Sequence, residues 1–126
     1  MSTQESGAGV GYLLSDDLMF TSRITGTANA LRLVVKPVRS LAMLEALIQQ
    51  QPPRCLLIDL SVAGAGLSDF MQRLREAGSP LPHVVAYGSH VDAATLRAAR
   101  EAGCDPVLPR SKFVEELPRA LAEWMV

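Results

Sequence analysis

Short apolar segments of strand length alternate along this chain with segments whose apolar residues recur at helical spacing. This alternation is typical of βαβ units, in which crossover helices join parallel strands. Parallel strands covered on both faces are near-continuous apolar runs, as several of these segments are. The predicted strands span residues 10–14, 31–38, 54–59, 83–87 and 106–108.

Prolines indicate the order of these strands in the sheet. Proline cannot donate a ladder hydrogen bond, so within sheets it is mostly confined to edges, strand starts and bulges. Pro37 lies in the second strand, and Pro106 and Pro109 bracket the fifth. We therefore expect these two strands at the edges. The order 2-1-3-4-5 meets this condition, so the predicted fold class is α/β, with a doubly wound, five-stranded parallel sheet of the flavodoxin-like type.

Polar residues and proline mark the expected ends of the helices. Ser40 and Asp92 precede apolar helical stripes as N-cap candidates, and Gly103 follows the second of these helices as its C-terminal glycine. Pro118 interrupts the last segment. Because an internal proline disrupts a helix, we expect a loose turn over residues 113–116 and then a final helix with Pro118 in its first turn.

Composition limits the class of protein. The chain has 126 residues, a size that fits one domain, and its net charge of -1 argues against a nucleic-acid partner. No apolar stretch approaches the ~20 residues of a membrane span, and no secretory signal precedes the first strand. The two cysteines lack motif spacing, which favours reduced thiols in a cytoplasmic protein. We expect residues 1–9 to be a disordered N-terminal segment and residues 10–126 to form the domain.

Three aspartates follow strands that the predicted order makes neighbours. Asp16 and Asp17 follow the first strand, and Asp59 ends the third. Ligand sites of open α/β sheets lie at the carboxyl ends of the strands, and clustered carboxylates need a divalent cation or protons. One interpretation is a metal site completed by the backbone carbonyl of Ser61. The alternative is ordinary turn aspartates, with Asp17 capping the helix that begins at Leu18.

These residue types suit phosphoryl transfer to a carboxylate. That reaction needs a nucleophilic aspartate, a divalent cation held by other acids, and positive charge near the phosphoryl oxygens. Asp59 is the candidate nucleophile, and Asp16 and Asp17 are candidates to hold Mg²⁺. The small residues of segment 61–66 predict a flexible loop that leaves the site open.

Three motifs make the sequence similar to a known family. They are Leu-Ser-Asp-Asp at 14–17, Leu-Leu-Ile-Asp at 56–59 and Glu-Ala-Gly-Cys-Asp at 101–105. Over residues 10–121 the chain resembles a receiver domain of the two-component response regulators. The resemblance implies a doubly wound receiver with Asp59 at the phosphoacceptor position and the two aspartates of the first motif at the metal positions.

The sequence departs from the family pattern at several positions. Family members have Thr or Ser at the end of strand four, where this chain has Gly88, so Ser89 is the candidate substitute. The family's Lys-Pro after strand five is replaced by Arg110 and Ser111, and Val107 stands at the position of its aromatic switch residue. Arg110 keeps the charge with a different donor geometry. It either contacts a phosphoryl group or serves as a standing counter-ion for the acids.

Two functions follow from the resemblance and its departures. The first is a stand-alone receiver-like signalling domain, not an enzyme, that accepts a phosphoryl group on Asp59 from a histidine kinase or phosphotransfer protein, with Mg²⁺ as cofactor. The second is a pseudo-receiver that binds proteins without being phosphorylated. For either, the expected partner surface combines the helix at 93–102, the strand at 106–108 and the final helix. A second copy of the chain, in a homodimer, is a further candidate partner.

Overall fold

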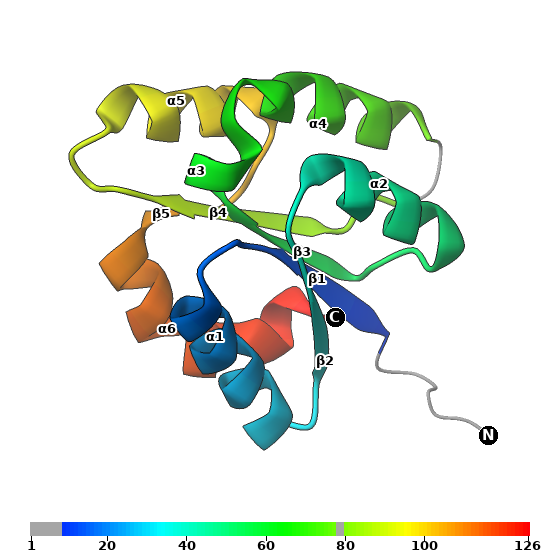
Figure 1. Ribbon diagram of the computed structural model, residues 1–126, viewed down its shortest axis with the longest axis vertical. Helices are drawn as coiled ribbons and strands as arrows, with labels where there is room; N and C mark the ends of the chain where they lie inside the picture. The colour runs from blue at the N-terminus through cyan, green and yellow to red at the C-terminus, as the bar shows by residue number, and fades with distance from the viewer. Residues whose placement is uncertain (1–8, 78–79) are drawn as a thin grey trace.

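The computed structural model describes residues 9–77 and 80–126. Five parallel strands form one sheet in the order β2-β1-β3-β4-β5, with helices on both faces (Figure 1). The predicted order is confirmed, since Pro37 lies in one edge strand and Pro109 ends the other. The strands are β1 Val10–Leu14, β2 Val34–Val38, β3 Cys55–Asp59, β4 His83–Gly88 and β5 Val107–Pro109.

The helices form a layer on each side of the sheet. On one side lie α1 (Leu18–Ala30) and α6 (Arg110–Trp124). On the other side lie α2 (Leu41–Gln50), α3 (Leu60–Ala63), α4 (Leu67–Glu76) and α5 (Ala93–Ala102), with the short 3-10 turn η2 (Gly64–Gly66) between α3 and α4. Within the described residues, no helix is long and apolar enough to cross a membrane.

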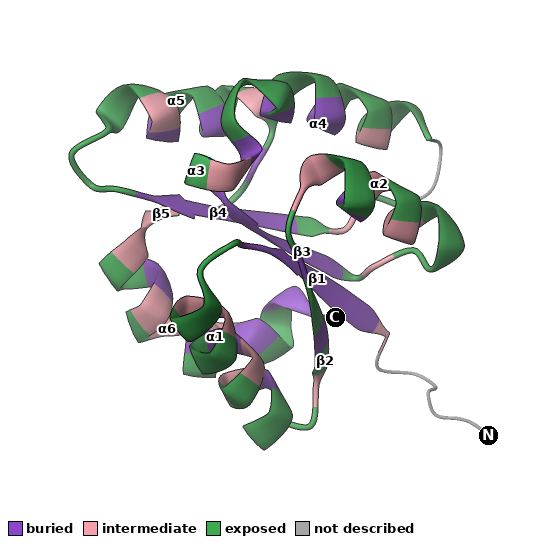
Figure 2. Ribbon diagram, in the orientation of Figure 1, coloured by how far each residue is buried: buried purple, intermediate pink, exposed green. Residues whose placement is uncertain are grey.

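The sheet separates two apolar clusters, and its central strands contribute to both. Leu56 and Ile58 of β3 pack under α2, α4 and α5, whereas Leu57 packs under α1 and α6. Side chains alternate between the two faces of a strand, and every residue of β1 and β3 is buried (Figure 2). This burial on both faces explains the continuous apolar runs in the sequence.

Helix caps agree with most of the predictions. Asp17, Ser40 and Asp92 each accept a hydrogen bond from the backbone N–H three residues later. Gly103 ends α5 with φ of 109°, a conformation that favours glycine.

Two predictions for segments next to the strands were wrong. The second strand begins at Val34 rather than residue 31, because Leu31 caps α1 and Arg32 turns the chain with φ of 61°. The expected flexible loop at 61–66 is helical, since Asp59 caps the short helix α3 and η2 continues from it. The predicted disordered segment 1–9 lies, except for Gly9, outside the described residues.

The prediction for the last segment was also wrong. Instead of a loose turn at 113–116 followed by a new helix, α6 runs without interruption from Arg110 to Trp124 with Pro118 in its interior. Four side chains spaced along one face of α6 are buried against the sheet, and their burial outweighs the local cost of the proline. They are Phe113, Leu117, Leu121 and Trp124.

Candidate functional site

Asp59 lies at the carboxyl end of the central strand β3 and is 1 % exposed. Its side chain caps α3, because Oδ1 accepts hydrogen bonds from the backbone N–H of Ser61 at 2.9 Å and from the Ser61 hydroxyl at 2.7 Å. The N–H groups at the start of a helix point back toward its cap, and their partial positive charge favours a carboxylate there. Asp59 is therefore a buried acid with its Oδ1 already engaged.

Arg110 provides the positive charge for this acid. It is the first residue of α6, directly after β5. Its Nη2 donates to Oδ2 of Asp59 at 3.4 Å, and its Nη1 lies 4.0 Å from Oδ2 of Asp17. The guanidinium carbon also lies 4.8 Å from the centre of the Phe20 ring, within the range of a cation–π contact. A planar guanidinium suits this position because it can stack on a ring while its edge faces carboxylates.

The structure brings two of the three predicted aspartates to Arg110. Asp17 also caps α1 through Oδ1, which accepts from the N–H of Phe20 at 3.0 Å. Asp16 is exposed, and no hydrogen bond or ion pair joins it to another described residue. In the described ranges 9–77 and 80–126, no three His, Cys, Asp or Glu side chains form a group that could hold a metal ion.

The donor atoms as placed do not fit a magnesium ion. Mg²⁺ requires near-octahedral oxygen ligands, but Arg110 lies between Asp17 and Asp59, and Ser61 donors cover the remaining oxygen of Asp59. The carbonyl of Ser61 belongs to the helical turn of α3, in which carbonyls point away from the cap. The assignment of Asp16, Asp17, Asp59 and Ser61 as metal ligands stays a prediction.

Gly88 and Ser89 lie at the end of β4, next to Asp59. Gly88 is buried, and a Cβ added to it would lie 3.3 Å from Cδ1 of Leu60, so it faces the side of the sheet that α3 covers. Ser89 is exposed, and its hydroxyl accepts a hydrogen bond from the N–H of Val91 at 3.4 Å. In this conformation the Ser89 hydroxyl is used within its own loop.

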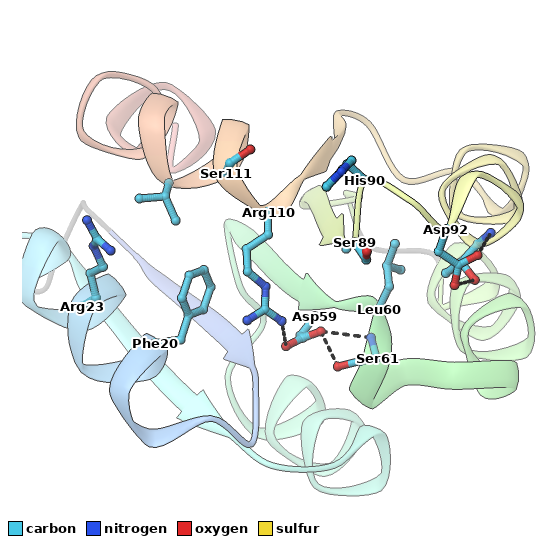
Figure 3. A pocket seen from close by; sticks show the side chains of 13 residues that line it. Phe20, Arg23, Asp59, Leu60, Ser61, Ser89, His90, Asp92, Arg110 and Ser111 are labelled. Atoms are coloured by element: carbon cyan, nitrogen blue, oxygen red, sulfur yellow. Dashed lines mark hydrogen bonds and ion pairs between the residues drawn. The ribbon is translucent and has the colours of Figure 1, made fainter.

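A cleft of about 980 Å³ opens at this edge of the sheet (Figure 3). Asp59, Ser61, Gly88, Ser89 and Arg110 all line it. Most of the residues singled out from the sequence therefore share one cavity, whereas Asp16 and Asp17 do not line it.

Two buried residues of the site were missed from the sequence. Tyr87 pairs directly with Asp59 in the ladder between β3 and β4, and its ring stacks on Phe113 with centroids 4.4 Å apart. Burial raises the pKa of Tyr87, and the charge of Asp59 adds to the rise. Ser15 is buried at the end of β1, on the other side of β3 from Tyr87. Its side-chain hydroxyl acts to lower the pKa of Tyr87. Their sequence signal was their position near the ends of β1 and β4, the two strands that flank β3.

Comparisons with known proteins identify the fold of the chain but give no close relative. No protein-family model matches the chain, and no curated protein matches it. Solved structures do match. The receiver domain of NtrX from Brucella abortus has a TM-score of 0.74 at 16% identity and covers 92% of this chain and 97% of its own. A response regulator from Chloroflexus aurantiacus has a TM-score of 0.77 at 18% identity, with coverages of 94% and 98%.

A third match is the orphan response regulator HP1043 of H. pylori, with a TM-score of 0.77 at 15% identity and coverages of 95% and 98%. Against a longer NtrX chain, this protein spans only 26% of the length. The chain therefore has the fold of response-regulator receiver domains, as its motifs indicated.

Proposed function

We propose that this chain is a receiver-type signalling domain that acts through protein contacts and accepts a phosphoryl group on Asp59. The observation that carries the proposal is the cleft, in which a carboxylate, a guanidinium and the backbone at the end of β4 converge. Convergent polar groups in one pocket are the usual sign of a functional site. The role is that of a signalling domain rather than an enzyme, and it requires contact with a cytoplasmic kinase or phosphotransfer protein.

The reaction is attack of an Asp59 oxygen on the phosphorus of a phosphohistidine in the partner. An oxygen–phosphorus bond forms, the phosphorus–nitrogen bond breaks, and the imidazole leaves as the acyl phosphate forms. Arg110 then exchanges its contact with Oδ2 for the phosphoryl oxygens and offsets their charge. The backbone N–H groups at Gly88 and Ser89, or the Ser89 hydroxyl, contribute the remaining donors. A Mg²⁺ ion at Asp16 and Asp17 would first require Arg110 to move away.

The second candidate is a pseudo-receiver that binds its partner without phosphorylation. The observation that favours it is the placement of Arg110, which contacts Asp59, Asp17 and the ring of Phe20 together. An arginine held by three partners supplies positive charge permanently and reduces the need for a metal. In this case the output surface is the face made by α5, β5 and α6, and its partner is another protein or a second copy of the chain.

Intact-protein mass spectrometry after incubation with Mg²⁺ and acetyl phosphate tests the proposal. We expect the wild type to gain one phosphoryl group, Asp59→Asn to gain none, and the exposed control Asp69→Asn to gain the same group as the wild type. A wild type that gains no phosphoryl group, with acetyl phosphate or with a phosphorylated phosphotransfer protein as donor, would contradict the first candidate. That result would leave the pseudo-receiver as the better description.

A further inference from the structure

The cleft extends beyond Asp59 toward α1 and α6, the two helices that cover one face of the sheet. Phe20 and Arg23 of α1 lie on this side of the cleft (Figure 3), and Val114 of α6 is another of its lining residues. A volume of about 980 Å³ is at the upper end of the range for small-molecule sites. Transfer of a phosphoryl group to Asp59 would use only the end of the cleft at β3 and β4, so the second half is left without a role.

This second half combines positive charge with apolar walls. Phe20 and Arg23 are three residues apart on α1 and therefore lie on the same face of the helix. The guanidinium of Arg110 lies against Phe20, but its charge is shared with Asp59 and Asp17. Among the residues that the structure describes, no carboxylate forms an ion pair with Arg23. Arg23 therefore offers an exposed guanidinium without a carboxylate partner in the cleft that Phe20 also lines.

The shape and charge of this region select one chemical class of ligand. A small inorganic anion would pair with Arg23 but leave the surfaces of Phe20 and Val114 uncovered. A neutral aromatic compound would cover those surfaces and leave the guanidinium without a partner. A molecule with a flat apolar body and one carboxylate or phosphate satisfies both requirements.

We propose that the cleft binds a small organic anion whose flat apolar body lies against Phe20 and Val114 and whose anionic group pairs with Arg23. The bound molecule would lie beside Arg110 and across the approach to Asp59. A small-molecule signal would therefore act at the same site as the phosphoryl group. The binding itself does not depend on phosphorylation of Asp59.

An NMR titration with 2-naphthoate tests the proposal, because this carboxylate has a flat apolar body and no phosphoryl group to transfer. Backbone amide resonances of the ¹⁵N-labelled chain would be followed. We expect saturable shifts centred on residues that line the cleft. Naphthalene-2-carboxamide, which keeps the body without the charge, and acetate, which keeps the charge without the body, should each bind at least about ten-fold more weakly.

Variants of Arg23 separate this site from general surface binding. Arg23→Gln should weaken 2-naphthoate binding by about ten-fold, the loss expected for one charge-assisted pair, and Arg23→Lys should keep part of the affinity. Arg97→Gln, which changes an exposed arginine of α5 outside the cleft, should have no effect. All three spectra also report whether the fold is intact.

Several results would overturn the proposal, whatever the outcome of the phosphorylation experiment. They are the absence of saturable shifts up to the solubility limit of 2-naphthoate, shifts centred away from the cleft, equal affinity for the carboxamide, and equal affinity in Arg23→Gln.

Discussion

Nη2 of Arg110 lies 3.4 Å from Oδ2 of Asp59, and the two partners differ greatly in exposure. The Asp59 side chain is 2 % exposed, whereas that of Arg110 is 42 % exposed. Removal of the arginine would leave a buried carboxylate with less compensation, but removal of the aspartate charge would leave a guanidinium that water can hydrate. Asp59 therefore depends on this ion pair more than Arg110 does, and the difference can be measured.

Tyr87→Phe should raise the free energy of unfolding by about 1 kcal/mol at neutral pH. Within the described part of the chain, the buried hydroxyl of Tyr87 has no well-aligned hydrogen-bond partner, and Phe removes the cost of burying it. The ring contacts with Phe20 and Phe113 would remain. Urea denaturation measures the change. A loss of stability would show that the hydroxyl makes a favourable contact in solution.

The same variant should change the alkaline pH dependence of stability. The pKa of Tyr87 is raised in the folded state above its ordinary value of about 10. Below that ordinary value both states hold the proton. Above it the unfolded chain ionises first, so wild-type stability falls as pH rises toward the folded pKa. Tyr12, whose pKa burial also raises, is common to both proteins. The stability advantage of Tyr87→Phe should therefore widen above about pH 10, and a constant difference across that range would contradict the prediction.

Pro118→Ala should stabilise the protein by about 1–2 kcal/mol, part of the cost of proline inside a helix. Pro118 is exposed in the interior of α6, so alanine adds a backbone N–H for the carbonyl four residues earlier without changing the core. Thermal or urea unfolding measures the gain. Glu123→Ala, at an exposed position near the end of the same helix, is the control and should change stability much less. A neutral or destabilising Pro118→Ala would indicate that α6 bends at this residue in solution.

Both cysteines should resist thiol reagents in the folded protein. Burial raises the pKa of Cys55 to about 12 and that of Cys104 to about 11, so almost no thiolate forms at pH 8. A chromogenic disulfide reagent should modify neither residue at a rate near that of the unfolded chain. Cys104, which lies before β5, should react before Cys55 in the central strand, because it needs a smaller opening. Rapid modification of native Cys55 would contradict this order.

The architecture could be predicted because it depends on features that are local in sequence. Apolar runs identified the strands, prolines identified the edges, and Ser40, Asp92 and Gly103 marked helix ends, each through a backbone requirement that does not depend on distant residues. The prediction failed for α6 because the buried face of that helix, a tertiary effect, overrides the local cost of Pro118. It failed for segment 61–66 because the cap by Asp59 fixes a helical turn in a glycine-rich stretch.

The sequence indicated only part of what shares the cleft, since Asp59, Gly88 and Arg110 line it and Asp16 does not. The order of the strands predicted that Asp16, Asp17 and Asp59 would lie at one edge, and the resemblance to receiver domains added Gly88 and Arg110. The partner that each carboxylate takes depends on side-chain directions, which spacing alone does not give. Tyr87 was missed for the same reason, since only the register of β3 with β4 pairs it with Asp59.

A double-mutant cycle between Asp59 and Arg110 is the most direct test of their relationship. The free energy of unfolding would be measured for the wild type, Asp59→Asn, Arg110→Gln and the double variant. We expect Arg110→Gln to cost about 1–2 kcal/mol alone, a value reduced for the exposure of the arginine. Once Asp59 is Asn, the cost should fall clearly, because only the contacts of Arg110 with Asp17 and Phe20 are then lost. The exposed pair of Lys112 with Glu116, 3.7 Å apart, is the control and should couple by less than about 0.5 kcal/mol. Equal costs of Arg110→Gln in the two backgrounds would contradict the conclusion that Arg110 is the standing counter-ion of Asp59.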